Sequence, residues 1–218
     1  MDPMKQITTK GRDIEASSFS IIDTEMAEYY GGHQFTAQQW SVVRRAIHTS
    51  GDFEFAKLFK FSERAIDSAL QAVRNGCPIV ADVTMITSGL SKRRMDQHGN
   101  QAHCFISDEE VMATAMKSGG TRAVEAMRKA RDLGLLDGGI VGIGNAPTAL
   151  FEVLRMVEAG EAKPALIIGI PVGFVKAIES KLALAEQDRV PFIASVGRKG
   201  GSPLVVSTLH ALMVEASK

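Results

Sequence analysis

Short apolar segments that alternate with amphipathic stretches constrain this chain more than any other feature. Residues 139–144, 165–170 and 191–196 are each rich in apolar side chains. Strands buried on both faces have this composition, and they occur in parallel sheets that helices cover on both sides. Stretches of helical length separate these segments, so we expect βαβ units with right-handed crossovers. The sequence therefore predicts an α/β fold of three layers, α/β/α, with a mainly parallel, Rossmann-like sheet.

The periodicity of apolar residues places the individual elements along the chain. We expect one domain over residues 1–218, with a helical N-terminal part over about residues 13–75 and an α/β part over about 78–218. In chain order, the expected elements are helices over residues 13–29, 36–51 and 62–74, a strand over 79–86, a strand over 102–106, helices over 107–116 and 121–132, a strand over 139–144, a helix over 148–159, a strand over 165–170, a helix that includes 177–182, a strand over 191–196 and a closing helix from Pro203. The helix after residue 106 is expected to begin with a capping box of Ser107 and Glu110.

Composition excludes several classes of function. The 25 basic and 25 acidic residues balance, so no net charge draws the chain to nucleic acid or to an anionic membrane. The longest apolar run is too short to span a bilayer, and the opening residues 1–5 lack the apolar core of a signal peptide. Cys77 and Cys104 fit neither a metal site nor a disulfide framework, and the histidines show no ligand spacing. We therefore expect a cytoplasmic protein with no protein-bound metal, no nucleic-acid partner and no membrane partner.

His48 is the most informative single residue. It falls in the last turn of a helix that Thr36 and Gln39 begin as a capping box and that Gly51 ends. A helix C-terminus favours imidazolium, and two nearby arginines, one of them Arg45, oppose that charge. Such a balance allows a histidine to give and take a proton near neutral pH. The alternative is a histidine that only caps the last carbonyls of its helix.

Four expected loops follow strands at the edge where doubly wound sheets bind their ligands. They offer hydroxyls, backbone amides at helix starts and cations, which suits a large ligand with several carboxylates. The basic run that ends the first loop could instead be a solvated surface. These loops comprise residues 87–94, 144–147, 171–173 and 197–202.

A nicotinamide-dependent oxidoreductase is an alternative with the same architecture. Gly142 and Gly144 stand where a dinucleotide fingerprint would begin, but Pro147 occupies the place of its third glycine. The following strand also lacks an acidic residue for the ribose, so this pattern disfavours the alternative. No Walker-type motif is present, which disfavours nucleotide phosphoryl transfer.

Six stretches of the sequence, taken together and in this order, form a specific pattern: residues 17–19, 43–48, 144–150, 169–175, 179–181 and 197–202. With them the sequence resembles the precorrin-8X methylmutase family, also called cobalt-precorrin-8 methylmutases. The resemblance extends over nearly the whole chain. One departure is His210, where the family pattern leads us to expect asparagine.

The resemblance implies an isomerase of corrin-ring biosynthesis rather than a transferase. Such an enzyme moves a methyl group from ring carbon eleven to ring carbon twelve of precorrin-8 or cobalt-precorrin-8, giving hydrogenobyrinate or cobyrinate. The shift is a proton-assisted, suprafacial 1,5-sigmatropic rearrangement that needs no methyl donor and no cofactor. The family's catalytic histidine falls on His48, and Ser18 and Arg45 should contact the corrinoid substrate. A homodimer that binds the macrocycle near its subunit interface is also implied.

Cations and hydroxyls elsewhere complete the expected substrate site. Arg45, Lys181 and Arg198 are expected to pair with acetate and propionate groups of the macrocycle. The remaining alternative is a non-catalytic corrinoid carrier that passes its ligand to another enzyme. The further substrate-binding candidates are Thr87, Ser88, Gly89 and Asn145.

Overall fold

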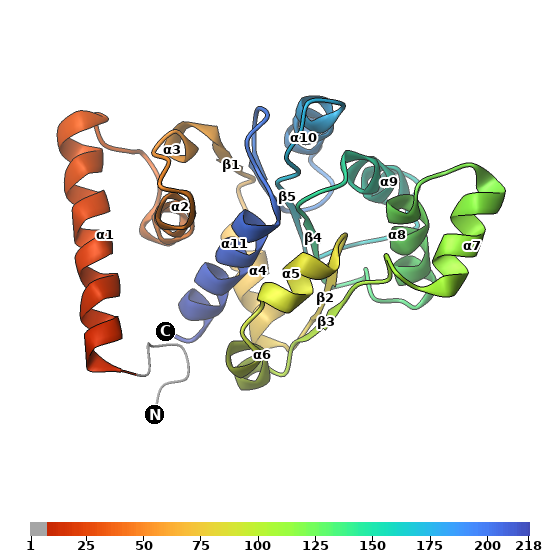
Figure 1. Cartoon of the computed structure of the whole chain (residues 1–218), viewed down its shortest axis with the longest axis horizontal. Helices are drawn as coiled ribbons and strands as arrows, with labels where there is room; N and C mark the ends of the chain where they lie inside the picture. Colours follow the sequence, from red (N-terminus) through yellow and green to blue (C-terminus); the bar gives the residue numbers. More distant parts are fainter. Residues whose placement is uncertain (1–7) are drawn as a thin grey trace.

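A computed structural model describes residues 8–218, and it places a six-stranded sheet between two layers of helices (Figure 1). The opening residues 1–7, on which the expectation about a signal peptide rests, lie outside the described residues. The strands are β1 (Phe59–Phe61), β2 (Pro78–Ala81), β3 (Gln101–His103), β4 (Ile140–Ile143), β5 (Leu166–Gly169) and β6 (Phe192–Ser195). The helices are α1 (Thr9–Tyr29), α2 (Ala37–Ser50), α3 (Phe55–Leu58), α4 (Ala65–Arg74), α5 (Thr84–Gly89), α6 (Lys92–His98), α7 (Glu109–Ser118), α8 (Arg122–Asp132), α9 (Pro147–Glu158), α10 (Ala177–Glu186) and α11 (Ser202–Ala216).

The strand order is β1-β6-β5-β4-β2-β3, and every neighbouring pair except β1 with β6 is parallel. This confirms the three-layer, mainly parallel prediction. From β2 the chain runs outward to β3 and then returns to β4 on the other side of β2. The order from β3 to β6 is that of flavodoxin-type doubly wound sheets, whose ligands bind where the winding direction reverses. Here that switch point lies between the carboxyl ends of β2 and β4.

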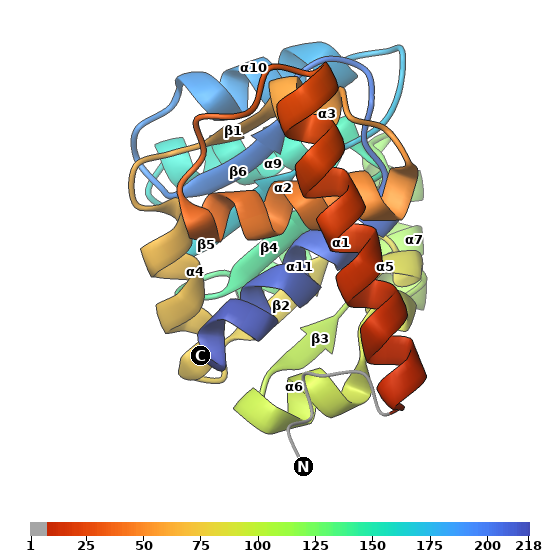
Figure 2. The ribbon, with the colours of Figure 1, turned by 90° about the vertical axis from the view of Figure 1, so that its left-hand side faces the viewer.

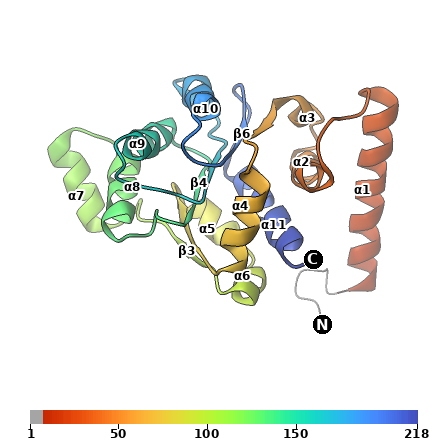
Figure 3. The ribbon, with the colours of Figure 1, turned by 180° about the vertical axis from the view of Figure 1, so that it is seen from behind.

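Successive strand residues point to opposite faces of the sheet, and both faces are buried. Ile140 and Ile168 pack on one side with α2, α4 and α11. Val141 and Ile167 pack on the other side with α8 and α9. Figure 3 shows the two helix layers from behind, with α4 and α11 on one side of the strands and α8 and α9 on the other. This double burial explains why the central strands are apolar throughout.

Two helices of the N-terminal part, α1 and α2, pack against each other beside the candidate active site. Figure 2 shows α1 lying across α2 on the outside of the molecule. The capping box of Thr36 and Gln39 is confirmed, and Gly51 ends α2 with a left-handed φ of 68°. The indole N–H of Trp40 in α2 donates to Asp23 of α1 at 2.8 Å, which fixes the two helices against each other.

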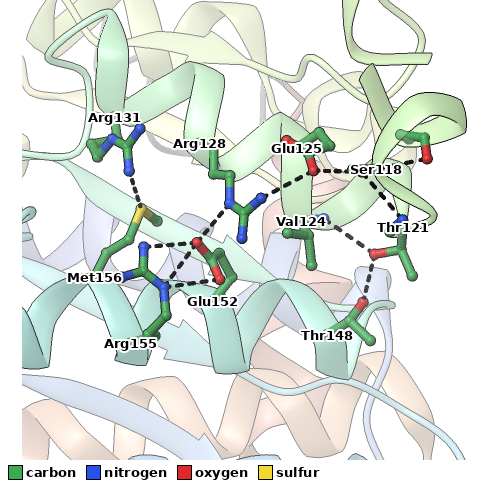
Figure 4. A network of polar contacts seen from close by, with 12 residues as sticks. Ser118, Thr121, Val124, Glu125, Arg128, Arg131, Thr148, Glu152, Arg155 and Met156 are labelled. Carbon is green, nitrogen blue, oxygen red and sulfur yellow. Dashed lines mark hydrogen bonds and ion pairs between the residues drawn. The ribbon is translucent and has the colours of Figure 1, made fainter. Parts of the chain in front are cut away.

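An ion-pair network joins α8 to α9 on the opposite side of the sheet (Figure 4). Glu152 of α9 accepts hydrogen bonds from Arg128 of α8 at 2.9 Å and from Arg155 of its own helix. Arg128 also bonds Glu125 at 3.1 Å, and Glu125 in turn accepts from the Ser118 hydroxyl. The side chains of Glu125 and Glu152 are each only 7% exposed, so their charges need these partners.

Three local predictions were wrong. The strand expected over residues 79–86 ends at Ala81, because the chain turns at Asp82 and α5 begins at Thr84. Residues 87–94 consequently form parts of α5 and α6 rather than a loop. The predicted capping box of Ser107 and Glu110 is absent, since Asp108 is the N-cap of α7 and makes no side-chain capping bond.

Strand β1 was missed altogether. Its three residues pair antiparallel with β6 at the edge of the sheet, so the N-terminal part is not purely helical. The strand expected over residues 102–106 is shorter and spans Gln101–His103. Within residues 8–218, no helix is long and apolar enough to cross a membrane.

Candidate active site

Helices α2, α5 and α11 enclose a groove of about 300 Å³ with a mainly apolar lining. Gly89 lets α5 approach α11 closely, because a Cβ atom there would lie 2.9 Å from Cγ2 of Val206. Among the predicted site residues, the structure therefore brings Arg45 and Gly89 to one groove. The complete lining is Arg45, Thr49, Met85, Gly89, Pro203, Val206, Ser207 and His210.

His48 and Arg45 of α2 both lie against Phe19 of α1, beside this groove. The ring of His48 meets the Phe19 ring edge-on, with 5.3 Å between centroids. The guanidinium of Arg45 lies 5.2 Å from the Phe19 centroid, and it pairs with Glu15 at 3.0 Å. His48 itself is exposed in the last turn of α2. The structure thus places an accessible imidazole next to a groove-lining arginine.

Ser18 lies beside Phe19 on α1, as the site prediction requires. Its hydroxyl donates to the carbonyl of Ile14 at 2.9 Å, which is a common way for a helical serine to satisfy its proton. The hydroxyl oxygen can still accept a hydrogen bond, because donating uses only its proton. The role of Ser18 in substrate binding stays a prediction.

Positive charge accumulates where α6 meets this region. Burial lowers the pKa of Arg94, and the nearby positive charges of Arg45 and Arg93 lower it further. Burial also lowers the pKa of His210 to about 4, with Arg94 and Arg45 acting in the same direction. His210 is therefore a neutral imidazole at physiological pH, and its Nε2 accepts the backbone N–H of Ser91 at 3.0 Å.

Asp82 occupies the switch point of the sheet, and the sequence analysis missed it. Its carboxylate accepts the backbone N–H groups of Gly144, Asn145 and Ala146 at 3.0, 2.8 and 2.6 Å. Burial raises the pKa of Asp82, and these three donors offset part of that effect. The amides after β4 are therefore already engaged, and the expectation that they would hold a ligand's carboxylate is wrong for this loop. The side chain of Asn145 remains exposed.

The basic loop after β6 separates its two cations. Lys199 forms ion pairs with Asp52 and Glu54, which follow α2 directly, and its hydrogen bond to Asp52 lowers the pKa of that carboxyl group. Arg198 is exposed, and its guanidinium lies 5.3 Å from the Phe174 ring centroid. Lys199 thus attaches the loop to the end of the His48 helix, while Arg198 remains accessible.

Lys181 lies beneath the same loop rather than on its surface. The side chain is fully buried, and its ammonium donates to the carbonyl of Lys199 at 2.9 Å. Burial lowers the pKa of Lys181 to about 8. In this structure Lys181 supports the loop, and it would have to move to reach a carboxylate of a ligand.

The two hydroxyls predicted after β2 lie on α5. Thr87 donates to the carbonyl of Thr84 at 2.9 Å, which uses its proton within the helix. Ser88 is exposed. Neither belongs to the groove lining, whereas Gly89 does. Sequence reasoning missed His210 as a groove residue, although its departure from the family pattern was the signal that could have identified it.

Comparison with known proteins shows the family to which this sequence is similar. The sequence profile of the family described as precorrin-8X methylmutase matches residues 13–215. A protein from Leptospira interrogans named cobalt-precorrin-8 methylmutase is 47% identical over 220 residues, covering 99% of this chain and 98% of that protein. A protein of the same name from Priestia megaterium is 46% identical, covering 97% of this chain and 91% of that protein.

A solved structure shares the fold as well as the sequence. It is the precorrin-8X methylmutase from Thermus thermophilus, which superposes with a TM-score of 0.88 at 45% identity. The match covers 94% of this chain and 96% of that chain. Family profile, full-length relatives and fold agree, so the chain belongs to the precorrin-8X methylmutase family.

Proposed function

We propose that this protein is the isomerase that moves a methyl group from ring carbon eleven to ring carbon twelve of precorrin-8 or its cobalt form. Family membership supports the reaction class, because methylmutases are isomerases. The observation that carries the site assignment is the apolar groove with Arg45 in its wall and His48 beside it. An apolar wall suits the face of a macrocycle, and an arginine suits its carboxylates.

His48 is the proposed proton donor and acceptor. A rearrangement within one molecule needs the macrocycle held in one conformation and one proton delivered to it and taken back. His48 is exposed and its helix is fixed at both ends, by the capping box and by the ion pairs of Lys199 with Asp52 and Glu54. An imidazole can act both as general acid and as general base, which is the role this reaction needs.

Replacing His48 by alanine tests this role. We expect turnover to fall by at least about 100-fold, the usual contribution of general acid–base catalysis, while the affinity for product changes little. Conversion is followed by absorption spectra and by mass, since an isomerisation changes colour at constant mass. His98→Ala is the matched control, because His98 lies on α6 and bonds Ser217 outside the groove. Wild-type turnover in the His48 variant would remove this residue from the mechanism.

A non-catalytic corrinoid carrier remains the alternative to an enzyme. Multiple-turnover kinetics separate the two, because a carrier converts nothing and releases the ligand it received. A nicotinamide-dependent oxidoreductase is disfavoured further by the loop after β4, whose amides Asp82 occupies. A titration with NADH, in which binding is detected by fluorescence, tests that alternative directly.

We further propose that the chain acts as a single domain and as a cytoplasmic homodimer. Helix α1 supports the dimer, because its outer side carries exposed apolar residues such as Ile14 and Ile21. Sedimentation equilibrium is expected to give twice the mass of one chain. A monomer over the working concentration range would contradict this proposal.

A further inference from the structure

His210 forms part of the groove wall on α11, and its hydrogen bonding fixes which nitrogen carries the proton. Its Nε2 accepts the backbone N–H of Ser91, the residue that joins α5 to α6. A neutral imidazole that accepts at Nε2 must carry its proton on Nδ1. The contact therefore sets the tautomer of His210 and attaches the α5–α6 junction to α11.

The protonated nitrogen is open to a ligand. Within residues 8–218, Nδ1 of His210 makes no hydrogen bond, and it is not among the buried side-chain atoms that lack a partner. His210 lines the groove and its Nδ1 is not fully buried, so we infer that a ligand in the groove can reach this N–H. An N–H donor in an apolar wall gains most from a ligand acceptor that replaces water.

The surroundings of His210 keep this donor uncharged. Arg45 of α2 and Arg94 of α6 are the charged groups that act on the ring, and both oppose a second proton on it. Glu15 pairs with Arg45 at 3.0 Å and so balances part of the charge of that guanidinium. The groove thus offers two different donors, a guanidinium at position 45 and a neutral N–H at position 210.

We propose that His210 is a specificity-determining residue, which donates from Nδ1 to a carboxylate oxygen of the corrinoid while its Nε2 holds the α5–α6 junction in place. This inference rests on the proposed function, since a corrinoid side chain supplies the acceptor. Arg45 would bind one acidic side chain of the corrinoid through its charge. The directional hydrogen bond from His210 would determine where a second acidic side chain of the corrinoid can lie. The two histidines then have different roles. His48 exchanges a proton with the corrinoid, whereas His210 donates a hydrogen bond and stays in one protonation state.

Two substitutions at position 210 test the proposal. His210→Phe keeps the ring but removes both hydrogen bonds, and we expect the Kd of hydrogenobyrinic acid and the KM of the substrate to rise by about 10-fold or more, as for a lost bond to a charged group. Since His210 exchanges no proton, kcat should change by less than about threefold. His210→Asn retains an amide that can donate, so it should recover most of the affinity. The matched control is His98→Asn, because His98 joins the far end of α6 to Ser217 without lining the groove.

A spectroscopic measurement on the unaltered protein covers the case in which a variant fails to fold. Nitrogen-15 NMR of the histidine rings should show His210 as the Nδ1–H tautomer at neutral pH, with a downfield shift of that proton when hydrogenobyrinic acid binds. An Nε2–H tautomer, or unchanged affinity in a folded His210→Phe protein, would overturn the inference alone. If the unaltered protein binds neither hydrogenobyrinic acid nor its cobalt form, the proposed function fails, and the inference fails with it.

Discussion

Arginines gather in two regions of this molecule, and they have different surroundings. On α8 and α9, Arg128 pairs with Glu125 and shares Glu152 with Arg155 (Figure 4). Arg131 pairs with Asp132 and Glu161, and Arg155 also pairs with Glu161, so acidic partners at least match the cations. Beside the groove, Arg45 pairs with Glu15 and also lies over an aromatic ring. There, burial lowers the pKa of Arg94, and the like charges of Arg45 and Arg93 lower it further, while Glu15 acts in the opposite direction.

The difference separates structural charge from charge that can bind a ligand. A closed network satisfies its own members and has little attraction left for an anion. A cluster in which cations repel each other gains when an acidic ligand arrives. We therefore expect substitutions in the α8–α9 network to change the free energy of unfolding, and substitutions beside the groove to change ligand binding.

The largest expected effect is on corrinoid affinity at position 45. Arg45→Met should raise the Kd of hydrogenobyrinic acid by about 10- to 100-fold, since hydrogen bonds to charged groups contribute about 1.5–3 kcal/mol. Arg44→Met is the matched control, because Arg44 pairs with Asp23 and does not line the groove. If the Kd of hydrogenobyrinic acid rose equally in the two variants, affinity would depend on nearby positive charge and not on a contact in the groove.

A substitution in the network should show the opposite pattern. Glu152→Gln leaves Arg128 and Arg155 without their shared carboxylate, and the unfolding free energy should fall by about 1–3 kcal/mol with corrinoid affinity unchanged. Asp96→Asn removes only an exposed pair with Lys92 and should cost less than about 1 kcal/mol. Urea titration measures both values, and a loss of affinity in the Glu152 variant would break the comparison.

Arg198 should show a smaller effect that depends on salt. It is exposed over Phe174, so screening weakens its attraction for a carboxylate. Arg198→Ala is expected to weaken binding by about threefold at low salt, with the difference vanishing near 1 M salt, where the Debye length is about 3 Å. A constant difference at all ionic strengths would point to lost contact area instead of charge.

The smallest effect concerns acid stability. The hydrogen bond from Arg155 lowers the pKa of Glu161 from about 4.5 to about 2. A depressed carboxyl pKa stabilises the folded state at pH values above the unfolded pKa, and this stabilisation is lost as pH falls toward the folded value. The stability difference between wild type and Glu161→Gln should therefore be constant above about pH 5.5 and shrink between pH 4.5 and 2. A difference that grows with acidity would contradict this assignment.

Much of the fold could be predicted because its central strands are buried on both faces. Their continuous apolar character is visible without the structure, and so is the capping box of α2. Helix α5 was mistaken for strand because Val83, Thr84 and Ile86 are β-branched, while the turn at Asp82 depends on amides that follow β4. Strand β1 was missed because three residues give too short a pattern, and its pairing partner β6 lies far along the chain.

The candidate site was predictable where a residue's helix determines its surroundings. Arg45 and His48 share α2 and lie one turn apart, so they must face the same region. Lys181 was expected to pair with a carboxylate of the macrocycle, yet its side chain is buried and bonds the loop after β6, an arrangement that is rare for lysine and that its own helix does not reveal. His210 could not be placed from its own helix, since its significance comes from Ser91, a residue 119 positions away.

Helix α11 has a consequence for how the chain is made. It packs against α2, α4 and α5, yet it is synthesised after all three of them. Lys199 lies 147 positions after Asp52, which at about 5–20 residues per second corresponds to roughly 7–30 s of translation. Until α11 follows, α2 lacks this packing partner, although α1 and α3 can already contact it. A ribosome-bound nascent chain therefore cannot form the groove before α11 is made, because α11 supplies four of the eight lining residues.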